Sequence, residues 1–374
     1  MPRTELKVLF LANSPRSGAS AKRAVAFASR LSGEMQTIVE FRQGRRITSF
    51  FGFLQVALTK RPDVIYAVDM AVSGVAAALF LRFFIGTPFV LDTGDIAVEV
   101  AKSGGRRGWC GVAATALLEY CAQRFAALIV VRGSFHKDLL ETKFRVPVVW
   151  VPDGVNLKEV EFRDNSLLRQ KLNLKGQFVV GVVGSMVWSE KYKVCYGWDL
   201  LEALGQIGSP SIVGLFVGDG DGRKILEERA TGLGIADRCR FVGTVEFELL
   251  SEYISLMDIC LSTQSNDLVG RVRTTGKLPL YLACNRYVIA TAVGEAARLV
   301  PEIGRTLAYA GVRDDTYPAR LAQAIAEAIR KPEELQRGAR GRSIAEREFD
   351  YDSLSGRVAT AIKMAMGESS SAHS

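Results

Sequence analysis

The chain has 374 residues, of which 48% are hydrophobic and 24% charged, and its formal net charge is +8. This length exceeds what one hydrophobic core supports, because single cores rarely grow past roughly 250–300 residues, and the composition excludes a largely disordered chain. The six cysteines are scattered without a Cys-x-x-Cys pair, which excludes a disulfide framework and a zinc site of ordinary spacing and favours a reducing compartment.

Short β-rich apolar runs alternate with longer helical patterns along the whole chain. This alternation is typical of parallel sheets that are covered by helices on both faces. In the first half, strands are expected at 7–12, 36–41, 64–67, 88–92, 127–131 and 146–151. In the second half, they are expected at 178–183, 211–217, 239–242, 259–262, 287–290 and 306–309.

Charge and polarity rise near 152–174, between the two series of strands. We therefore expect an α/β protein of two Rossmann-like domains, at 1–160 and 161–345. A helix at 346–366 is expected to pack back across the domains, and a disordered tail is expected at 367–374. Ligands of open parallel sheets bind beyond the carboxyl ends of the strands, so the two sheets are expected to face a central cleft.

A loop of small residues, 13–23, follows the first expected strand and opens into a helix. Around Gly18 this loop presents backbone N–H groups at a helix N-terminus, where an anion is stabilised. The loop matches neither the dinucleotide-binding pattern nor the P-loop pattern. Phosphate binding and an ordinary tight turn both remain open.

The stretch 49–60 repeats apolar residues at the spacing of one helical face. That face consists of Phe50, Phe53, Leu54, Ala57 and Leu58. Arg42, Arg45 and Arg46 precede it, and residues 1–60 hold ten Lys or Arg against three Glu, a net charge of +7. A basic, Phe-rich helix either lies in an anionic membrane surface or packs against the core, and the pattern leaves both interpretations open.

Two apolar stretches bear on export and membrane insertion. Val8–Ala12 is too short for a secretory signal, so a cytoplasmic protein is expected. The longer stretch 71–91 is interrupted by Arg82 and by the turn residues Gly86, Thr87 and Pro88. It predicts a buried helix followed by a buried strand rather than a membrane span.

Histidine is scarce, with His136 and His373 alone in the sequence. Nucleophilic machinery of the Ser/His/Asp or Cys/His kind is therefore excluded. His136 lies on a helical run and is expected to be a surface or packing residue.

The segment Gly218–Gly222 follows an expected strand and reads Gly-Asp-Gly-Asp-Gly. Its Asp-x-Asp could hold a metal, but position twelve of a calcium loop would be Ala230 rather than Glu. A glycine-rich turn between strand and helix is the preferred interpretation, and no metal site is expected.

The segment 265–282 carries the densest chemistry in the chain. Its functional candidates are Arg271, Arg273, Thr274, Thr275, Gly276 and Lys277. Cations, hydroxyls and a glycine ahead of a helix predict a cradle for a diphosphate that needs no metal. The alternative is a solvated basic loop in which a threonine caps the helix.

Four segments of the second half, in this order, resemble the C-terminal domain of retaining GT-B glycosyltransferases of family 4. They are Val182–Ser185 with Tyr196–Leu201, Phe216–Gly220, Arg240–Val245, and Lys277–Ala283 with Val288–Thr291. The first half adds Arg61–Tyr66, Leu118-Glu119 and Val151–Asn156, the last of which resembles the family's domain junction. Each match is short, but their order covers roughly 6–365.

This resemblance implies a GT-B fold with the nucleotide diphosphate sugar in the second domain and the acceptor in the first. It implies transfer with retention of configuration and without a metal, a cofactor or nucleic acid. The acceptor is unknown, either lipid-linked or a saccharide, and the basic first domain is expected to contact the inner face of the cell membrane. The implied donor-binding residues are Gly18, Ser185, Lys191, Lys193, Gly218, Thr244, Val245, Arg271, Arg273, Thr274, Thr275, Gly276 and Lys277.

The chain also departs from the family pattern. The family's Glu-x7-Glu is replaced by Val272 and Leu280, and its His before Asp falls at Gly94, which leaves Asp95 as the catalytic candidate. The family's Arg falls at Ser185, and the paired Lys has no clean match, although Lys191 and Lys193 lie nearby.

Without the two glutamates, sugar recognition would fall to Gln264, Asn266, Asp267 or Asp95. Two alternatives to an active transferase therefore stay open. One is a catalytically weakened helper or binding subunit of the same fold, and the other is a sugar-nucleotide epimerase or hydrolase.

Overall fold

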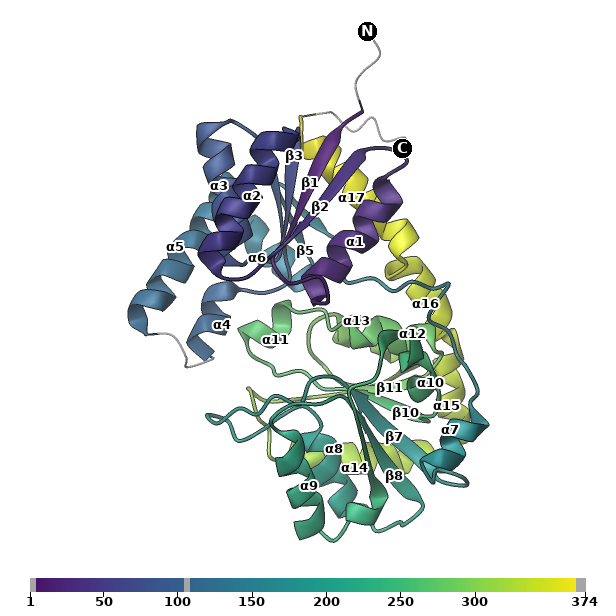
Figure 1. Cartoon of the computed structure of the whole chain (residues 1–374). Helices are drawn as coiled ribbons and strands as arrows, with labels where there is room; N and C mark the ends of the chain where they lie inside the picture. The colour runs from purple at the N-terminus through teal and green to yellow at the C-terminus, as the bar shows by residue number, and fades with distance from the viewer. Residues whose placement is uncertain (1–4, 104–107, 368–374) are drawn as a thin grey trace. The chain divides into compact units, whose positions relative to one another are not determined.

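A computed structural model describes residues 5–103 and 108–367 (Figure 1). The expected disordered tail lies outside the described residues, apart from Gly367. The chain divides into two compact units, and each is described by itself below. The first comprises Met1–Gly154, Val272–Thr274 and Tyr351–Ser374. The second comprises Val155–Arg271 and Thr275–Asp350.

The first unit is built on a six-stranded parallel sheet with the order β2-β1-β3-β4-β5-β6. Its strands are β1 (Lys7–Ala12), β2 (Gln36–Phe41), β3 (Val64–Val68), β4 (Phe89–Thr93), β5 (Leu128–Val131) and β6 (Val148–Trp150). Its helices are α1 (Ala19–Leu31), α2 (Arg46–Lys60), α3 (Val72–Phe84), α4 (Ala97–Ser103), α5 (Trp109–Phe125), α6 (Ser134–Lys143) and α17 (Tyr351–Ala365).

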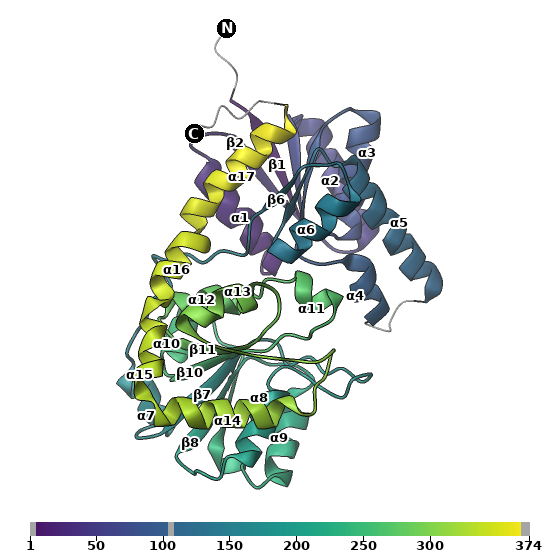
Figure 2. The same ribbon diagram turned by 180° about the vertical axis from the view of Figure 1, so that it is seen from behind.

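Successive side chains of β1 enter two different cores, because side chains alternate between the faces of a strand. Val8 and Phe10 pack with α1 and α17, and Figure 2 shows these two helices side by side. Leu9 and Leu11 pack on the other face with α2, α3, α5 and α6. A strand buried on both faces explains the unbroken apolar run at the start of the sequence.

The second unit is built on another six-stranded parallel sheet, with the order β12-β11-β10-β7-β8-β9. Its strands are β7 (Phe178–Val183), β8 (Ile212–Val217), β9 (Cys239–Gly243), β10 (Ile259–Ser262), β11 (Tyr287–Thr291) and β12 (Gly304–Leu307). Its helices are α7 (Ser166–Lys171), α8 (Trp198–Gln206), α9 (Arg223–Gly232), α10 (Leu250–Ser255), α11 (Leu268–Val272), α12 (Lys277–Ala283), α13 (Gly294–Ile303), α14 (Tyr317–Arg330), α15 (Pro332–Leu335) and α16 (Gly341–Glu348).

These two parallel sheets confirm the expected α/β architecture, and all twelve expected strands are present within about two residues. The last strand begins at Gly304 rather than at 306. It begins earlier because Gly304 pairs with Val288, and a Cβ at Gly304 would lie 1.9 Å from the Val288 carbonyl oxygen. Close packing against Val288 therefore requires a glycine at the start of this strand.

The amphipathic stretch 49–60 forms most of α2, and its apolar stripe packs against the core. Phe53, Leu54 and Ala57 are buried against the sheet. The core interpretation of this stripe is confirmed, and its interpretation as a membrane-facing stripe is wrong. Leu58 lies outside the core and is 51% exposed.

The apolar stretch 71–91 forms helix α3 and most of the buried strand β4, as expected. Helix α3 is buried on one face only, because Phe83 and Phe84 are 57% and 73% exposed. Gly86 separates the two elements with a positive φ of 84°. Among the helices of the described residues, none has both the length and the apolar composition needed to cross a bilayer.

Candidate functional site

The second unit contains a point at which the strand order reverses. The chain runs from β7 outward through β8 to β9, and then returns to β10 on the other side of β7. Crevices at such reversals, beyond the carboxyl ends of the strands, are the usual ligand sites of open α/β sheets. Gly184 follows β7 here, and Ser262 ends the neighbouring β10.

Glycines bring the ends of β7 and β8 into close contact at this edge. Gly218 has a φ of 133°, and a Cβ there would lie 2.0 Å from the carbonyl oxygen of Gly184. Any other residue would force the two strand ends apart. The ends of β7 and β8 therefore pack backbone against backbone at this edge.

Lys277 brings a positive charge to the crevice. Its ammonium nitrogen lies 3.3 Å from the centroid of the Tyr196 ring. It also lies 3.6 Å from the position that a Cβ of Gly184 would occupy. The Tyr196 hydroxyl donates to the Leu261 carbonyl at 2.7 Å, so the ring beneath the ammonium is held by the end of β10.

Two hydroxyl groups complete this part of the site. The Thr275 Oγ1 and Ser262 Oγ atoms are 3.4 Å apart. Ser262 is fully buried, whereas Thr275 and Gly184 are partly exposed. A cation, a hydroxyl and partly exposed glycine backbone form a set suited to a phosphate or diphosphate. We call this set, Gly184, Tyr196, Ser262, Thr275 and Lys277, the β7–β10 crevice. Helix α12 has only seven residues, so the positive charge of this set comes from Lys277 rather than from a helix dipole.

Sequence reasoning missed Tyr196 and Ser262. Tyr196 stands in one of the segments that resemble the family, and Ser262 closes an expected strand. Both residues stand in segments that the sequence singles out, but the sequence does not show that β7 and β10 are neighbours. Their role depends on the adjacency of β7 and β10, strands that are more than seventy residues apart in the sequence.

Three expected donor-binding residues lie on the loop after β7. Ser185 is exposed directly beyond Gly184. Lys193 donates to Glu190 at 2.5 Å, and the Lys191 ammonium lies 4.9 Å from the Tyr192 ring centroid. Both lysines therefore have local partners on their own loop.

Four further expected residues lie elsewhere in the second unit. Thr244 and Val245 follow β9, where Thr244 is exposed and Val245 packs against the core. Arg271 lies in α11 and is exposed, and Gly276 is the residue before α12.

The Gly-Asp-Gly-Asp-Gly segment is a turn in which both carboxylates accept hydrogen bonds from backbone amides. Asp219 accepts from Gly220 N–H at 2.8 Å, and Asp221 accepts from Trp188 N–H at 2.7 Å. Across residues 5–103 and 108–367, no cluster of three or more His, Cys, Asp or Glu is arranged to hold a metal.

The expected sugar-recognising residues of the second unit make hydrogen bonds within the protein. Asp267 Oδ1 accepts from the Ser265 hydroxyl and from Gly270 N–H, at 2.8 and 2.9 Å. Asn266 donates to the Tyr309 carbonyl, and Gln264 donates to the Gly270 carbonyl. Val272 and Leu280, which replace the family's glutamates, are both buried.

Residues 272–274 group with the first unit. The Arg273 guanidinium pairs there with the Asp95 carboxylate, and the Thr274 hydroxyl donates to the Arg132 carbonyl. The expected cradle is thus divided, because Arg271, Thr275, Gly276 and Lys277 belong to the second unit.

Gly18 precedes α1 in a tight turn of the first unit. The Ser14 hydroxyl accepts from Ala21 N–H at 3.2 Å, and a Cβ at Gly18 would lie 2.4 Å from that hydroxyl oxygen. This close approach accounts for the glycine.

A buried ionic network, which sequence reasoning did not find, joins the strand ends of the first unit. Arg23 is 2% exposed and donates to Asp92 at 2.7 Å, and Asp92 also accepts from the Tyr66 hydroxyl at 2.9 Å. Arg132 pairs with Asp69 in the same cluster. Burial, reinforced by the Asp92 carboxylate, raises the pKa of Tyr66 well above its usual value. The sequence signal for this network was Arg23, a charged residue on the mostly apolar face of α1.

His136 is completely buried in α6, which confirms it as a packing residue. Burial lowers its pKa from 6.5 to about 4, opposed by the Asp95 charge. As pH falls, the unfolded chain takes up a proton at His136 before the folded protein does. This contribution to the free energy of unfolding is therefore complete above pH 6.5 and is lost toward pH 4.

Between pH 6.5 and pH 4, the free energy of unfolding of the His136→Leu variant should fall by up to about 3 kcal/mol less than that of the parent protein, as measured by urea unfolding. Parallel pH profiles of the two proteins would contradict this expectation.

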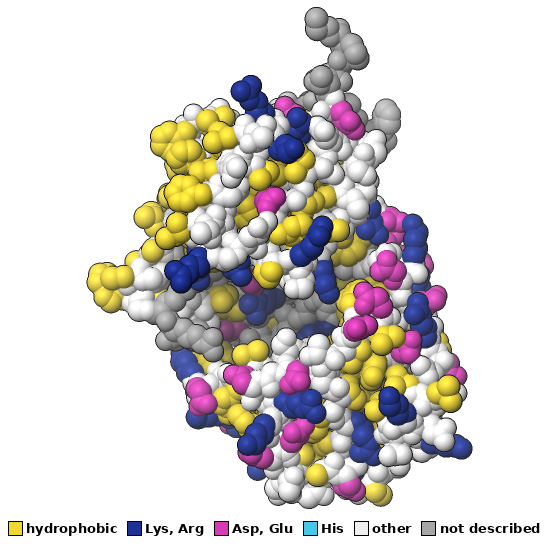
Figure 3. Space-filling view, in the orientation of Figure 1, with side chains coloured by type: hydrophobic (Ala, Val, Ile, Leu, Met, Phe, Trp, Pro, Cys, Tyr) yellow, Lys and Arg dark blue, Asp and Glu magenta, His cyan; other side chains and the backbone are white. Residues whose placement is uncertain are grey.

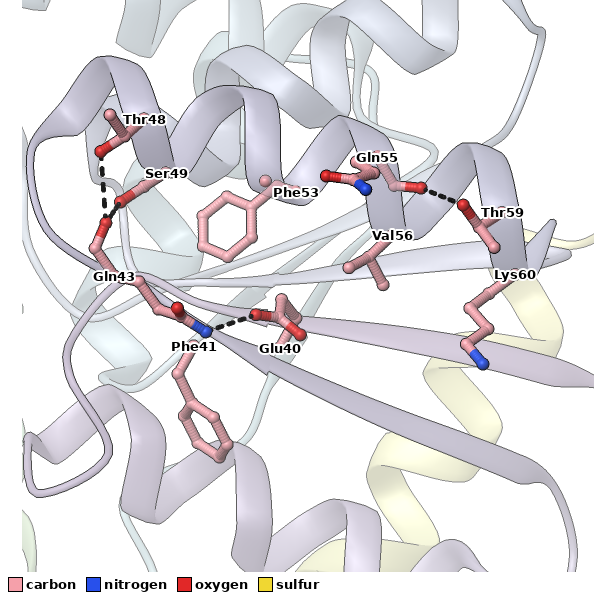
Figure 4. A pocket seen from close by; sticks show the side chains of 11 residues that line it. Glu40, Phe41, Gln43, Thr48, Ser49, Phe53, Gln55, Val56, Thr59 and Lys60 are labelled. Carbon is pink, nitrogen blue, oxygen red and sulfur yellow. Dashed lines mark hydrogen bonds between the residues drawn. The ribbon is translucent and has the colours of Figure 1, made fainter.

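A separate groove of about 480 Å³ lies between β2 and α2 in the first unit (Figure 4). Its polar groups bond to one another: Gln43 donates to Glu40, and the Ser49 hydroxyl donates to the Gln43 carbonyl. Lys60 is the one cation among its eleven lining residues. A single cation without an arranged set of donors is a poor match for a diphosphate, so the β7–β10 crevice is the better candidate.

Comparisons with known proteins show what the chain resembles. Residues 177–331 match the family described as "Glycosyl transferases group 1". A D-inositol 3-phosphate glycosyltransferase of Geodermatophilus obscurus is 34% identical over 134 residues, which are 36% of this chain and 27% of that relative. The chain thus spans about a quarter of the length of this relative.

Solved structures resemble the fold over almost the whole chain. Anabaena HepE, solved in complex with UDP and glucose, has a TM-score of 0.74 and 19% identity, covering 96% of this chain and 99% of that one. Sucrose-phosphate synthase from Thermosynechococcus elongatus has a TM-score of 0.76 and 17% identity, covering 97% and 100%. The chain therefore has the GT-B fold, and residues 177–331 of its second unit are similar to the group 1 glycosyltransferases.

Proposed function

We propose that this protein transfers a sugar from a nucleoside diphosphate sugar to an acceptor, and that the β7–β10 crevice holds the diphosphate. The observation that carries the proposal is the Lys277 ammonium beside Gly184 and Tyr196, at the strand reversal of a domain similar to the group 1 glycosyltransferases. HepE was solved with UDP and with UDP-glucose, so UDP is the first nucleotide to test.

In this mechanism the positive charge of Lys277 stabilises the diphosphate as it leaves the sugar. Charge of this kind lowers the barrier most when it is already in place before the reaction. Thr275, which is partly exposed, adds a hydroxyl donor to the phosphate oxygens, and the buried Ser262 hydroxyl contacts it at 3.4 Å. Retention of configuration, acceptor binding in the first domain and a catalytic role for Asp95 rest on the family resemblance and are part of the proposal.

A thermal-shift screen tests donor binding directly, because a ligand that binds only the folded state raises stability by mass action. At a concentration of 100 times its Kd, UDP should add about 2.7 kcal/mol. Uridine at the same concentration should add much less, because it lacks the diphosphate. Equal stabilisation by UDP and by uridine would contradict the proposal that the β7–β10 crevice binds the diphosphate.

A helper or binding subunit is the second candidate function. It is favoured by Val272 and Leu280, which are buried and apolar where the family carries carboxylates for the sugar and ribose hydroxyls. UDP release from UDP-sugars that depends on an added acceptor would identify a transferase. Binding of UDP without turnover would identify the helper, and free sugar or an epimer as product would identify a hydrolase or epimerase.

We expect transfer to continue in excess chelator. Both carboxylates of the Asp219–Asp221 turn accept backbone N–H groups, and Lys277 offers charge to the diphosphate without a metal. The measurement is UDP release before and after chelation, with the rate unchanged. Loss of activity that magnesium or manganese restores would show a metal requirement.

We further propose that the acceptor is lipid-linked or a saccharide and that the first domain contacts the inner face of the cell membrane. Support comes from the net charge of +7 within residues 1–60. Clustered Lys and Arg are attracted to anionic lipid headgroups.

A further inference from the structure

Three neighbouring helices of the first unit, α2, α3 and α5, expose large apolar side chains to solvent. Figure 3 shows hydrophobic side chains gathered over the region that Figure 1 labels with these helices. We call this surface the aromatic face. Its residues are Ile47, Phe51, Leu58, Phe80, Phe83, Phe84, Ile85, Trp109, Leu117, Tyr120 and Phe125, with exposures from 37% to 83%.

Ring contacts link α2 to α3 and α3 to α5 at the aromatic face, the first of them through the half-buried Phe50. Phe50 of α2 has ring contacts with Phe51 and with Phe80 of α3, at centroid distances of 5.2 and 6.3 Å. Phe80 stacks on Phe84 at 4.5 Å, and Phe83 meets Phe125 of α5 at 4.8 Å. Isolated exposed apolar residues are ordinary, but a contiguous aromatic surface marks an interaction site.

The exposed charged side chains of these three helices are all positive. Arg46, Lys60, Arg82 and Arg124 are exposed on them. Across 46–60, 72–84 and 109–125, all described, the single carboxylate is Glu119. Glu119 is buried and accepts from the N–H groups of Ala97 and Val98. The outer surface of the three helices thus carries cations and no carboxylate.

We propose that the aromatic face docks on a lipid bilayer that contains anionic headgroups. Phe, Trp and Tyr side chains enter the boundary between headgroups and acyl chains, while Arg and Lys reach the lipid phosphates. A protein partner would more often meet charges of both signs on such a surface. This inference deepens the membrane contact proposed above and moves it from the buried stripe of α2 to the exposed side chains of three helices.

The test is co-flotation with vesicles of phosphatidylcholine alone or mixed with phosphatidylglycerol. The parent protein should float with the mixed vesicles, and added salt should weaken this binding because it screens the headgroup charge. Phe51→Ser combined with Phe84→Ser should lower partitioning at least about ten-fold. Arg82→Ser combined with Arg124→Ser should lower it by a similar factor, on the order of ten-fold, without touching an aromatic ring.

A matched control replaces exposed apolar residues of the second unit. Leu167→Ser combined with Leu249→Ser removes side chains that are 78% and 43% exposed, and this variant should bind vesicles as the parent does. Melting curves of all variants should coincide, because every replaced side chain is exposed. If Phe51→Ser combined with Phe84→Ser lowers the melting temperature, vesicle binding by the Arg82→Ser, Arg124→Ser variant and the salt dependence of binding test the proposal instead.

Trp109, which is 83% exposed at the start of α5, provides a direct probe. Its fluorescence should shift to shorter wavelength with mixed vesicles, and the shift should be absent in Trp109→Phe. Failure of the parent to bind any vesicle would overturn the proposal. So would a parent dimer in analytical ultracentrifugation that Phe51→Ser with Phe84→Ser converts to monomer, since the face would then join two copies. UDP stabilisation is independent of either result, so the donor assignment is tested separately.

Discussion

Replacing Lys277 with alanine is expected to weaken UDP binding about ten- to hundred-fold while leaving uridine binding nearly unchanged. A hydrogen bond to a charged group contributes about 1.5–3 kcal/mol, and that contribution is lost with the ammonium. Because positive charge on the leaving group matters most in the transition state, kcat/KM for transfer should fall by about 100-fold or more. Calorimetry with UDP and uridine, together with UDP-release kinetics, measures both effects.

Lys193→Ala serves as the matched control. Lys193 lies on the loop after β7, beyond Gly184, and pairs with Glu190 at 2.5 Å. Its loss should change UDP affinity much less than the loss of Lys277. Lys277→Arg should restore part of the binding, because the charge is kept while its geometry changes. If Lys193→Ala and Lys277→Ala weakened UDP equally, or if neither did, the diphosphate would lie elsewhere.

Replacing Arg23 with leucine is expected to destabilise the first domain by about 3–5 kcal/mol, because it leaves the buried Asp92 carboxylate without its nearest cation. Arg23 also donates to the carbonyls of Val151 and Pro152, both at 2.8 Å. A loss of this size is a large fraction of the total stability of an ordinary domain. Urea unfolding followed by circular dichroism measures it.

Arg30→Leu is the control on the same helix. Arg30 pairs with Asp352 at 2.5 Å, but the two side chains are 21% and 46% exposed. Solvent screening limits such pairs to about 1 kcal/mol or less. Adding Asp92→Asn to Arg23→Leu should recover part of the lost stability, since the unpaired charge is removed. Equal effects of Arg23→Leu and Arg30→Leu would show that the network is not desolvated.

The two predictions rest on residues that sequence reasoning treated differently. Lys277 was identified from its place in a basic segment, but its expected companion Arg273 pairs with Asp95 in the first unit. Arg23 and Asp92 were not identified at all. A charged residue inside an apolar pattern shows that it needs a partner, but the partner can be far away in the sequence. Asp92 is 69 residues from Arg23.

Much of the architecture followed from the sequence alone. The twelve strands, the helices between them and the two-sheet α/β fold were predicted because period and composition are local properties of a chain. The turn at Gly218–Gly222 also followed from local chemistry. These features need no knowledge of which elements become neighbours. His136 was expected to be a surface or a packing residue, and its burial in the structure decides for packing.

Only the tertiary structure decided which face of α2 is buried and which side chains form the β7–β10 crevice. An amphipathic pattern marks an apolar stripe, but Phe51 and Leu58 become exposed because neighbouring helices and the sheet cover only part of α2. Lys277, Tyr196 and Ser262 meet because β10 returns to the side of β7. Strand order depends on packing across the whole domain, and short-range periodicity carries no information about it.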